Sequence, residues 1–188
     1  MKKVKIALLA LAAIVLVLPA CKKGPDDPFI SFKSRDGRLM RGWNLTAIAE
    51  TVVDGSSTPA LTTTTTYNGS SLVTSYSDGS PTTTATGTYT MTIGKNGVVT
   101  YTETYTAPGA TSATVASGTG TWMWWSSSKS KEFLLIDGAS NLFSGGMYFV
   151  DELKSKELIL EVNSSSTSTS GGITIPKSTT AKYTFEEQ

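Results

Sequence analysis

Histidine is absent from this 188-residue chain, and cysteine occurs once, at Cys21. Without histidine, neither a Ser-His-Asp nor a Cys-His catalytic arrangement can be built, and a His-ligated zinc or iron site is excluded as well. The side chain best suited to proton transfer near neutral pH is also missing. A single cysteine allows no internal disulfide. We therefore expect a protein that is not an enzyme and that uses no metal or other cofactor.

Charge is scarce too. Charged residues make up 16% of the chain, against roughly a quarter in ordinary globular proteins. Removing residues 1–20 leaves 13 basic and 15 acidic residues, so no basic surface remains to attract nucleic acid. Polarity comes instead from 30 threonines, which are disfavoured in helices and fit a pleated sheet. This composition favours an exported β protein and excludes a nucleic-acid partner.

The first 21 residues have the layout of an export signal. A basic start, Met1–Lys5, precedes 13 consecutive apolar residues, Ile6–Leu18, which as a helix would span about 20 Å. Because the hydrocarbon core of a bilayer is roughly 30 Å thick, this run predicts a signal peptide rather than a membrane span. Leu18-Pro-Ala-Cys21 resembles the lipobox of bacterial lipoproteins. We therefore predict a signal peptide over 1–20, lipidation of Cys21, and a membrane partner reached through those acyl chains.

A segment rich in Pro, Gly and charge follows, and it predicts a flexible tether over 21–38 ahead of a domain over 39–188. Asp26-Asp27 is similar to the acidic signal of Bacteroidetes lipoproteins that are exported to the cell surface. We expect a cell-envelope protein of the outer membrane, on either its periplasmic or its surface face. Three arginines spaced by three residues are expected in a solvated segment that precedes the first strand and covers the barrel mouth, with an anion site as the alternative: Arg35, Arg38 and Arg41.

Turn signals are dense in the domain. Asx-Gly pairs accept the positive φ angles of tight hairpins, and five of them occur: Asp54-Gly55, Asn68-Gly69, Asp78-Gly79, Asn96-Gly97 and Asp137-Gly138. Pro108-Gly109 and Gly145-Gly146 add two further turns. Ser/Thr/Gly-rich stretches predict loops over 126–130 and 163–172.

Between the turns, side chains alternate with a period of two, as in Val99 to Tyr105, where valine and tyrosine face one way and threonine the other. The pattern predicts ten strands: 42–53, 60–67, 71–77, 83–93, 97–107, 113–125, 132–137, 146–152, 157–163 and 180–186. Such a chain predicts an all-β fold, an antiparallel up-and-down meander of about 8–10 strands closed into a barrel. A two-sheet β-sandwich is the alternative.

Several stretches resemble the lipocalin-like lipoproteins of the Bacteroidetes. They are Asp27-Pro-Phe-Ile-Ser-Phe-Lys-Ser-Arg35, Arg38 to Trp43, Gly118-Thr-Gly-Thr-Trp-Met-Trp124, Tyr148 to Leu153 and Lys156 to Leu160. The resemblance implies a lipocalin-like barrel and a cell-envelope address, and it implies no particular ligand. The chain departs from true lipocalins because Gly42 and Trp43 are adjacent and no long C-terminal helix follows the strands.

Aromatic residues supply most of the candidate ligand-binding positions. Trp43 either lines a cavity or plugs the closed end of the barrel with its indole N–H on a carbonyl. Trp122 and Trp124 face one side of their strand, where they form core or cavity wall, and Trp125 faces the other side. Tyr101 and Glu103 share an inward face, on which Glu103 is either a polar group in a pocket or a solvated residue near the strand end.

These residues leave two functions open. A barrel lined by Trp43, Tyr101, Glu103, Trp122 and Trp124 would bind a small hydrophobic ligand in a mostly apolar cavity. Alternatively, Trp125 and the Ser/Thr-rich loops would contact a glycan or a protein from the outside of a barrel that holds no ligand.

Overall fold

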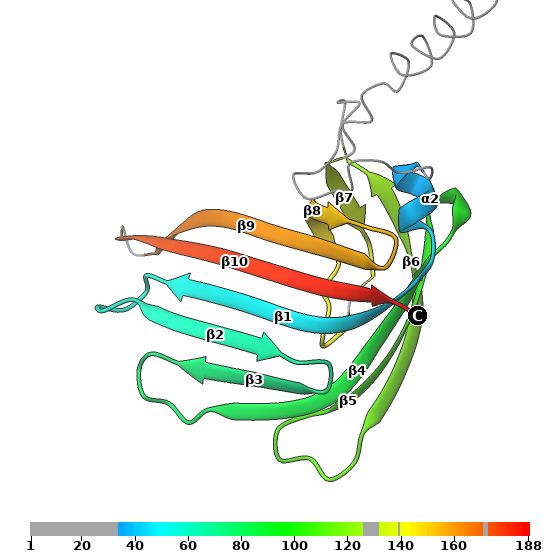
Figure 1. Ribbon diagram of the computed structural model, residues 1–188. Coiled ribbons are helices and arrows are strands. Elements are labelled where there is room, and N and C mark those ends of the chain that lie inside the picture. The colour runs from blue at the N-terminus through cyan, green and yellow to red at the C-terminus, as the bar shows by residue number, and fades with distance from the viewer. Residues whose placement is uncertain (1–33, 126–131, 139, 171–172) are drawn as a thin grey trace, which may run out of the picture.

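The computed structural model describes residues 34–125, 132–138, 140–170 and 173–188, which form a closed antiparallel β-barrel (Figure 1). The strands are β1 (Gly42–Asp54), β2 (Leu61–Tyr67), β3 (Ser71–Tyr76), β4 (Thr83–Ile93), β5 (Val98–Thr106), β6 (Thr114–Trp124), β7 (Phe133–Ile136), β8 (Gly146–Leu153), β9 (Glu157–Ser170) and β10 (Ile173–Glu187). A helix, α2 (Arg35–Leu39), precedes them, and a 3₁₀ turn, η1 (Lys95–Gly97), lies between β4 and β5. In this part of the chain no helix is both long and apolar enough to cross a bilayer.

Each strand pairs with its neighbours in sequence, and β10 returns to β1 to close the ring. The predicted all-β, up-and-down barrel is therefore confirmed, and the sandwich alternative is wrong. Tight turns explain why consecutive strands pair. Asn96 and Gly97 both have positive φ, 61° and 74°, as a tight turn between antiparallel strands requires. Gly69, Gly79 and Gly109 are also left-handed, in agreement with the turns expected there.

The barrel is wider at one end than at the other, because β1 changes partners along its length. Gly42–Asn44 pairs with β4, whereas Ile48–Asp54 pairs with β2. The β2–β3 hairpin therefore takes part in the wall at one end only. At the narrow end the ring contains the other eight of the ten strands.

At the wide end, the long strands continue beyond the closed wall. β9 pairs with β8 as far as Glu161, and its remaining residues pair only with β10. In Figure 1 this part of β9 and β10 projects from the barrel beside β1, β2 and β3. The predicted loop over 163–172 is wrong, since β9 runs to Ser170 and β10 starts at Ile173. Ser and Thr are common in loops, but here the pairing with β10 satisfies their backbone groups.

Helix α2 covers the narrow end of the barrel. The Ser34 side chain accepts a hydrogen bond from the Gly37 amide at 3.1 Å and caps the helix. Leu39 is fully buried, and Arg35 and Arg38 are each only 5% exposed. The expectation that Arg35 and Arg38 are solvated is therefore wrong, because both side chains are buried where α2 packs on the barrel. Residues 21–33 of the predicted tether lie outside the described residues. The predicted signal peptide and Cys21 lie outside the described residues.

The interior is filled by a plug loop, residues 140–145, which connects β7 to β8. Phe143 is completely buried, and Leu142 is 4% exposed. The Phe143 ring lies 5.1–5.5 Å, centroid to centroid, from four aromatic rings that belong to β4, β8 and β10: Tyr89, Tyr148, Tyr183 and Phe185. A chain segment inside the ring therefore completes the hydrophobic core.

Candidate functional site

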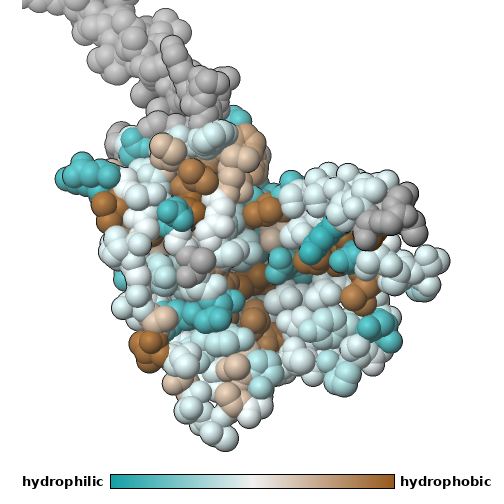
Figure 2. Space-filling view, turned by 180° about the vertical axis from the view of Figure 1, so that it is seen from behind, coloured by the Kyte–Doolittle hydropathy of each residue, from teal (hydrophilic) through white to brown (hydrophobic). Residues whose placement is uncertain are grey.

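A recess with a volume of about 180 Å³ opens where the packed core ends and the projecting strands begin. Seen from behind, the molecule is hollowed where these strands leave the barrel, with hydrophobic residues in the floor of the hollow (Figure 2). We call this cavity the Glu50 recess. Its lining consists of Glu50, Ser144, Gly145, Gly146, Met147, Tyr148, Val162, Thr179, Ala181 and Tyr183.

Glu50 is the one carboxylate among these lining residues. It lies on β1 opposite Ala181 of β10 and Thr65 of β2. Because alanine is small, space remains beside the carboxylate. Partial burial raises the pKa of Glu50 above its ordinary value. Within the described residues, no hydrogen bond or ion pair to the Glu50 carboxylate is found.

Two tyrosines form the aromatic wall of the Glu50 recess. The rings of Tyr148 and Tyr183 meet edge to face, with centroids 5.7 Å apart. The Tyr148 hydroxyl donates a hydrogen bond to the Ser144 carbonyl of the plug loop. Burial raises the pKa of Tyr183 to about 12, and the negative charge of Glu50 contributes to this shift. Both phenols therefore stay protonated at neutral pH, and Glu50 faces neutral rings.

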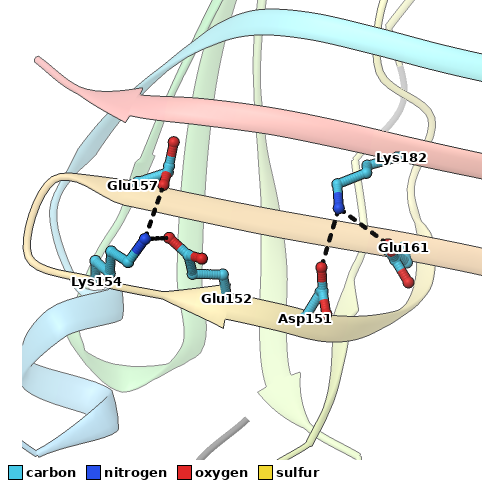
Figure 3. A network of polar contacts seen from close by, with 6 residues as sticks. All are labelled: Asp151, Glu152, Lys154, Glu157, Glu161 and Lys182. Carbon is cyan, nitrogen blue, oxygen red and sulfur yellow. Dashed lines mark hydrogen bonds and ion pairs between the residues drawn. The ribbon is translucent and has the colours of Figure 1, made fainter. Parts of the chain in front are cut away.

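Other carboxylates nearby have lysine partners, as Figure 3 shows for the strands β8 to β10. Lys182 lies 3.0 Å from an Asp151 oxygen and 3.3 Å from a Glu161 oxygen. Lys154 pairs with Glu152 and with Glu157 in the same way. Glu50 differs from these residues because no basic side chain lines its recess.

A larger hollow of about 470 Å³ lies at the tip of the projecting strands and is lined mainly by small residues: Val53, Gly55, Ala60, Ser165, Ser166, Thr167, Pro176, Lys177 and Ser178. Its lining contains no aromatic ring and no carboxylate. It lacks the convergent polar and apolar groups that mark ligand sites. We therefore regard the smaller Glu50 recess as the candidate site.

The structure places the predicted ligand-binding tryptophans at the narrow end or within the barrel wall, where protein groups satisfy their indole N–H donors. Trp43 is fully buried and donates to the Leu39 carbonyl at 2.9 Å. Trp122 donates to the Gly94 carbonyl at 2.8 Å. Trp124 donates to an Asp36 oxygen at 2.6 Å, and the Arg35 guanidinium lies over its ring. These contacts attach α2 and the β4–β5 turn to the barrel.

Glu103 points inward and is 1% exposed. Its carboxylate accepts hydrogen bonds from the Asn141 amide at 3.1 Å, the Asn141 side chain at 2.8 Å and the Leu142 amide at 2.7 Å. Glu103 is therefore the residue that holds the plug loop, and it is not solvated. Tyr101 stacks on Tyr89 with ring centroids 6.0 Å apart. None of the five predicted ligand-binding residues lines the Glu50 recess.

Sequence reasoning overlooked Glu50, although a signal was present. Glu50 follows Ile48 and precedes Val52 at intervals of two, so an acidic residue interrupts an otherwise apolar face of the strand. No group of three or more potential metal-ligating residues occurs within the described ranges. In the comparisons with known proteins, no family model, no curated protein and no solved structure matches this chain.

Proposed function

We propose that this protein is a membrane-anchored cell-envelope lipoprotein whose lipocalin-like barrel binds a small, partly apolar ligand at its wide end. The ligand proposal depends on a difference between two parts of the barrel interior, the packed core and the recess at the wide end. Phe143 and its neighbours fill the core, whereas the Glu50 recess combines tyrosine rings with a carboxylate that has no hydrogen-bond or ion-pair partner among the described residues. A concave site with apolar walls and few polar groups is typical of small-molecule binding.

The recess is smaller than the 300–1,000 Å³ of sites that enclose a whole drug-sized ligand. It would therefore hold one end of a ligand, and the remainder would lie along the projecting strands. The inner face of these strands beyond Glu50 carries Val52 and Thr179, which are both partly buried. Such a surface suits an amphipathic molecule.

The anchor is supported by the sequence pattern around Cys21. Twelve residues lie between Cys21 and the helix cap at Ser34, so the thirteen Cα–Cα steps could span up to about 45 Å if fully extended. Several acyl chains on one cysteine would give durable anchoring, because each buried methylene contributes about 0.8 kcal/mol. The proposal places the protein in the outer membrane and assigns it no catalytic activity.

The anchor is tested by expressing Cys21→Ala with labelled palmitate in a bacterial host that processes lipoproteins. We expect the wild type to incorporate label and fractionate with the membrane, and the variant to do neither. Label that persists on the variant would disprove lipidation of Cys21.

The ligand proposal is tested by native mass spectrometry of the wild-type protein extracted gently from its membrane. A small molecule should remain bound, and it should be absent from Ala181→Leu, in which the larger side chain fills the recess beside Glu50. Repeated spectra that show only the mass of the lipidated chain would count against a ligand carrier.

A second function, contact with a glycan or a protein, is favoured by an outer ledge on β6–β8. Its exposed apolar side chains are Met123, Trp125, Phe133 and Met147, with exposed fractions of 53%, 55%, 38% and 50%. The Trp125 amide donates to the Phe133 carbonyl at 2.8 Å, so two of these residues are adjacent. Exposed aromatic residues of this kind mark interaction surfaces. If Trp125→Ala abolishes retention on immobilised cell-wall glycan while Ala181→Leu does not, this second function is supported.

A further inference from the structure

Glu50 differs from the other carboxylates near it because no counter-charge is found for it in the described part of the chain, although it lies in a concave, partly buried place. Desolvating a carboxylate without a partner costs free energy, so proteins usually pair such groups. Asp151, Glu152, Glu157 and Glu161 follow that rule through Lys154 and Lys182. Among the described residues Glu50 has no such lysine, so a cationic ligand would supply the counter-charge that the carboxylate lacks there.

The surroundings of Glu50 specify the chemistry of that partner. The rings of Tyr148 and Tyr183 lie edge to face at the wall of the recess, and the negative faces of aromatic rings attract cations. No lysine or arginine lines the recess to compete for the carboxylate. Val162 adds apolar surface. A carboxylate beside aromatic and aliphatic surface is suited to an organic cation.

From this arrangement we infer that the Glu50 recess binds a protonated amine carried on a short apolar body, with Glu50 as its counter-ion and Tyr148 and Tyr183 as its aromatic wall. The inference rests on the proposed function, because it names the ligand class of the same recess. A volume of about 180 Å³ accommodates an ammonium group and a few methylenes. The rest of a larger ligand would extend over the projecting strands.

The experiment compares hexylammonium with its neutral analogue 1-hexanol at pH 7 on the mature protein. Binding is followed by calorimetry and by the NMR signals of labelled tyrosine rings. We expect hexylammonium to bind at least tenfold more tightly than 1-hexanol and to shift the signals of Tyr148 and Tyr183. Glu50→Gln should reduce this ratio to about one, whereas binding of 1-hexanol should be unchanged.

The matched control is Glu161→Gln, which removes a carboxylate from the outer face of β9 that is paired with Lys182. This variant should bind hexylammonium like the wild type, which separates a local effect from a change in net charge. If both probes bind the wild type equally, or if Glu50→Gln keeps the full preference for the amine, the inference is overturned while a ligand-binding recess stands. If neither probe affects Tyr148 or Tyr183, both the inference and the proposed ligand site are overturned.

Discussion

Phe143→Ala is the most direct test of how the barrel interior is built. The Phe143 side chain is fully buried and makes ring contacts at centroid distances of 5.1, 5.3, 5.4 and 5.5 Å. Its partners belong to strands of the closed wall, which cannot collapse freely into the vacated space. Because removing a buried Phe side chain costs about 3–5 kcal/mol, we expect a loss of about 4–5 kcal/mol in the free energy of unfolding.

The assay is equilibrium urea unfolding followed by near-ultraviolet circular dichroism, which reports on these packed rings. Such a loss is a large part of the roughly 5–15 kcal/mol that stabilises an ordinary domain. Phe143→Leu, which retains more apolar volume, should therefore lose clearly less and should still be measurable if Phe143→Ala does not fold. Phe133→Ala is the control, because Phe133 is 38% exposed on the outer ledge and its loss should cost about 1 kcal/mol or less. A loss below about 1 kcal/mol for Phe143→Ala would refute the plugged interior.

Three further predictions concern other parts of the barrel. Glu103→Gln should lower the free energy of unfolding by about 3 kcal/mol in urea titrations, because it removes the charged acceptor of three plug-loop donors, of which the Leu142 amide is buried. Gly120→Ala should lower the thermal midpoint of unfolding much more than Gly118→Ala. A Cβ at position 120 would lie 1.7 Å from the backbone carbonyl oxygen of Asp137, whereas a Cβ at position 118 would meet only the end of the Tyr101 side chain. Since burial raises the folded-state pKa of Glu50, its ionised form destabilises the fold, and Glu50→Gln should be more stable than wild type at pH 7. That advantage should shrink as the pH falls through the raised pKa towards 4, and an advantage independent of pH would contradict this origin.

The strands and most of the turns could be predicted from sequence because their determinants are local. Val99, Tyr101 and Tyr105 alternate with threonines within one strand, and Asn96-Gly97 specifies its own turn through its backbone angles. Each signal spans fewer than ten residues and depends little on the rest of the chain. The number and spacing of the predicted strands and turns indicate a meander that closes into a barrel.

The plug loop could not be predicted because its determinants are non-local. Leu142 and Phe143 are two apolar residues in a stretch without periodicity, and only Glu103, about forty residues earlier, shows why they are held inside. The strand pairing beyond residue 162 is a similar case. Serine and threonine there have the composition of a loop, and the register with β10 makes them a strand. Helix α2 has only five residues, too few to show a helical period.

The change of partner along β1 connects the architecture to the proposed site. Where β1 pairs with β4, its inward side chain Trp43 is fully buried. Where it pairs with β2, the wall includes an extra hairpin, and the inward position is taken by the partly exposed Glu50. Adding strands enlarges a barrel, so the interior widens at the level where the plug loop ends. At that level the inward side chains no longer fill the interior, and the Glu50 recess remains. A ligand would therefore enter from the wide end, opposite α2, and meet the carboxylate before it met the core.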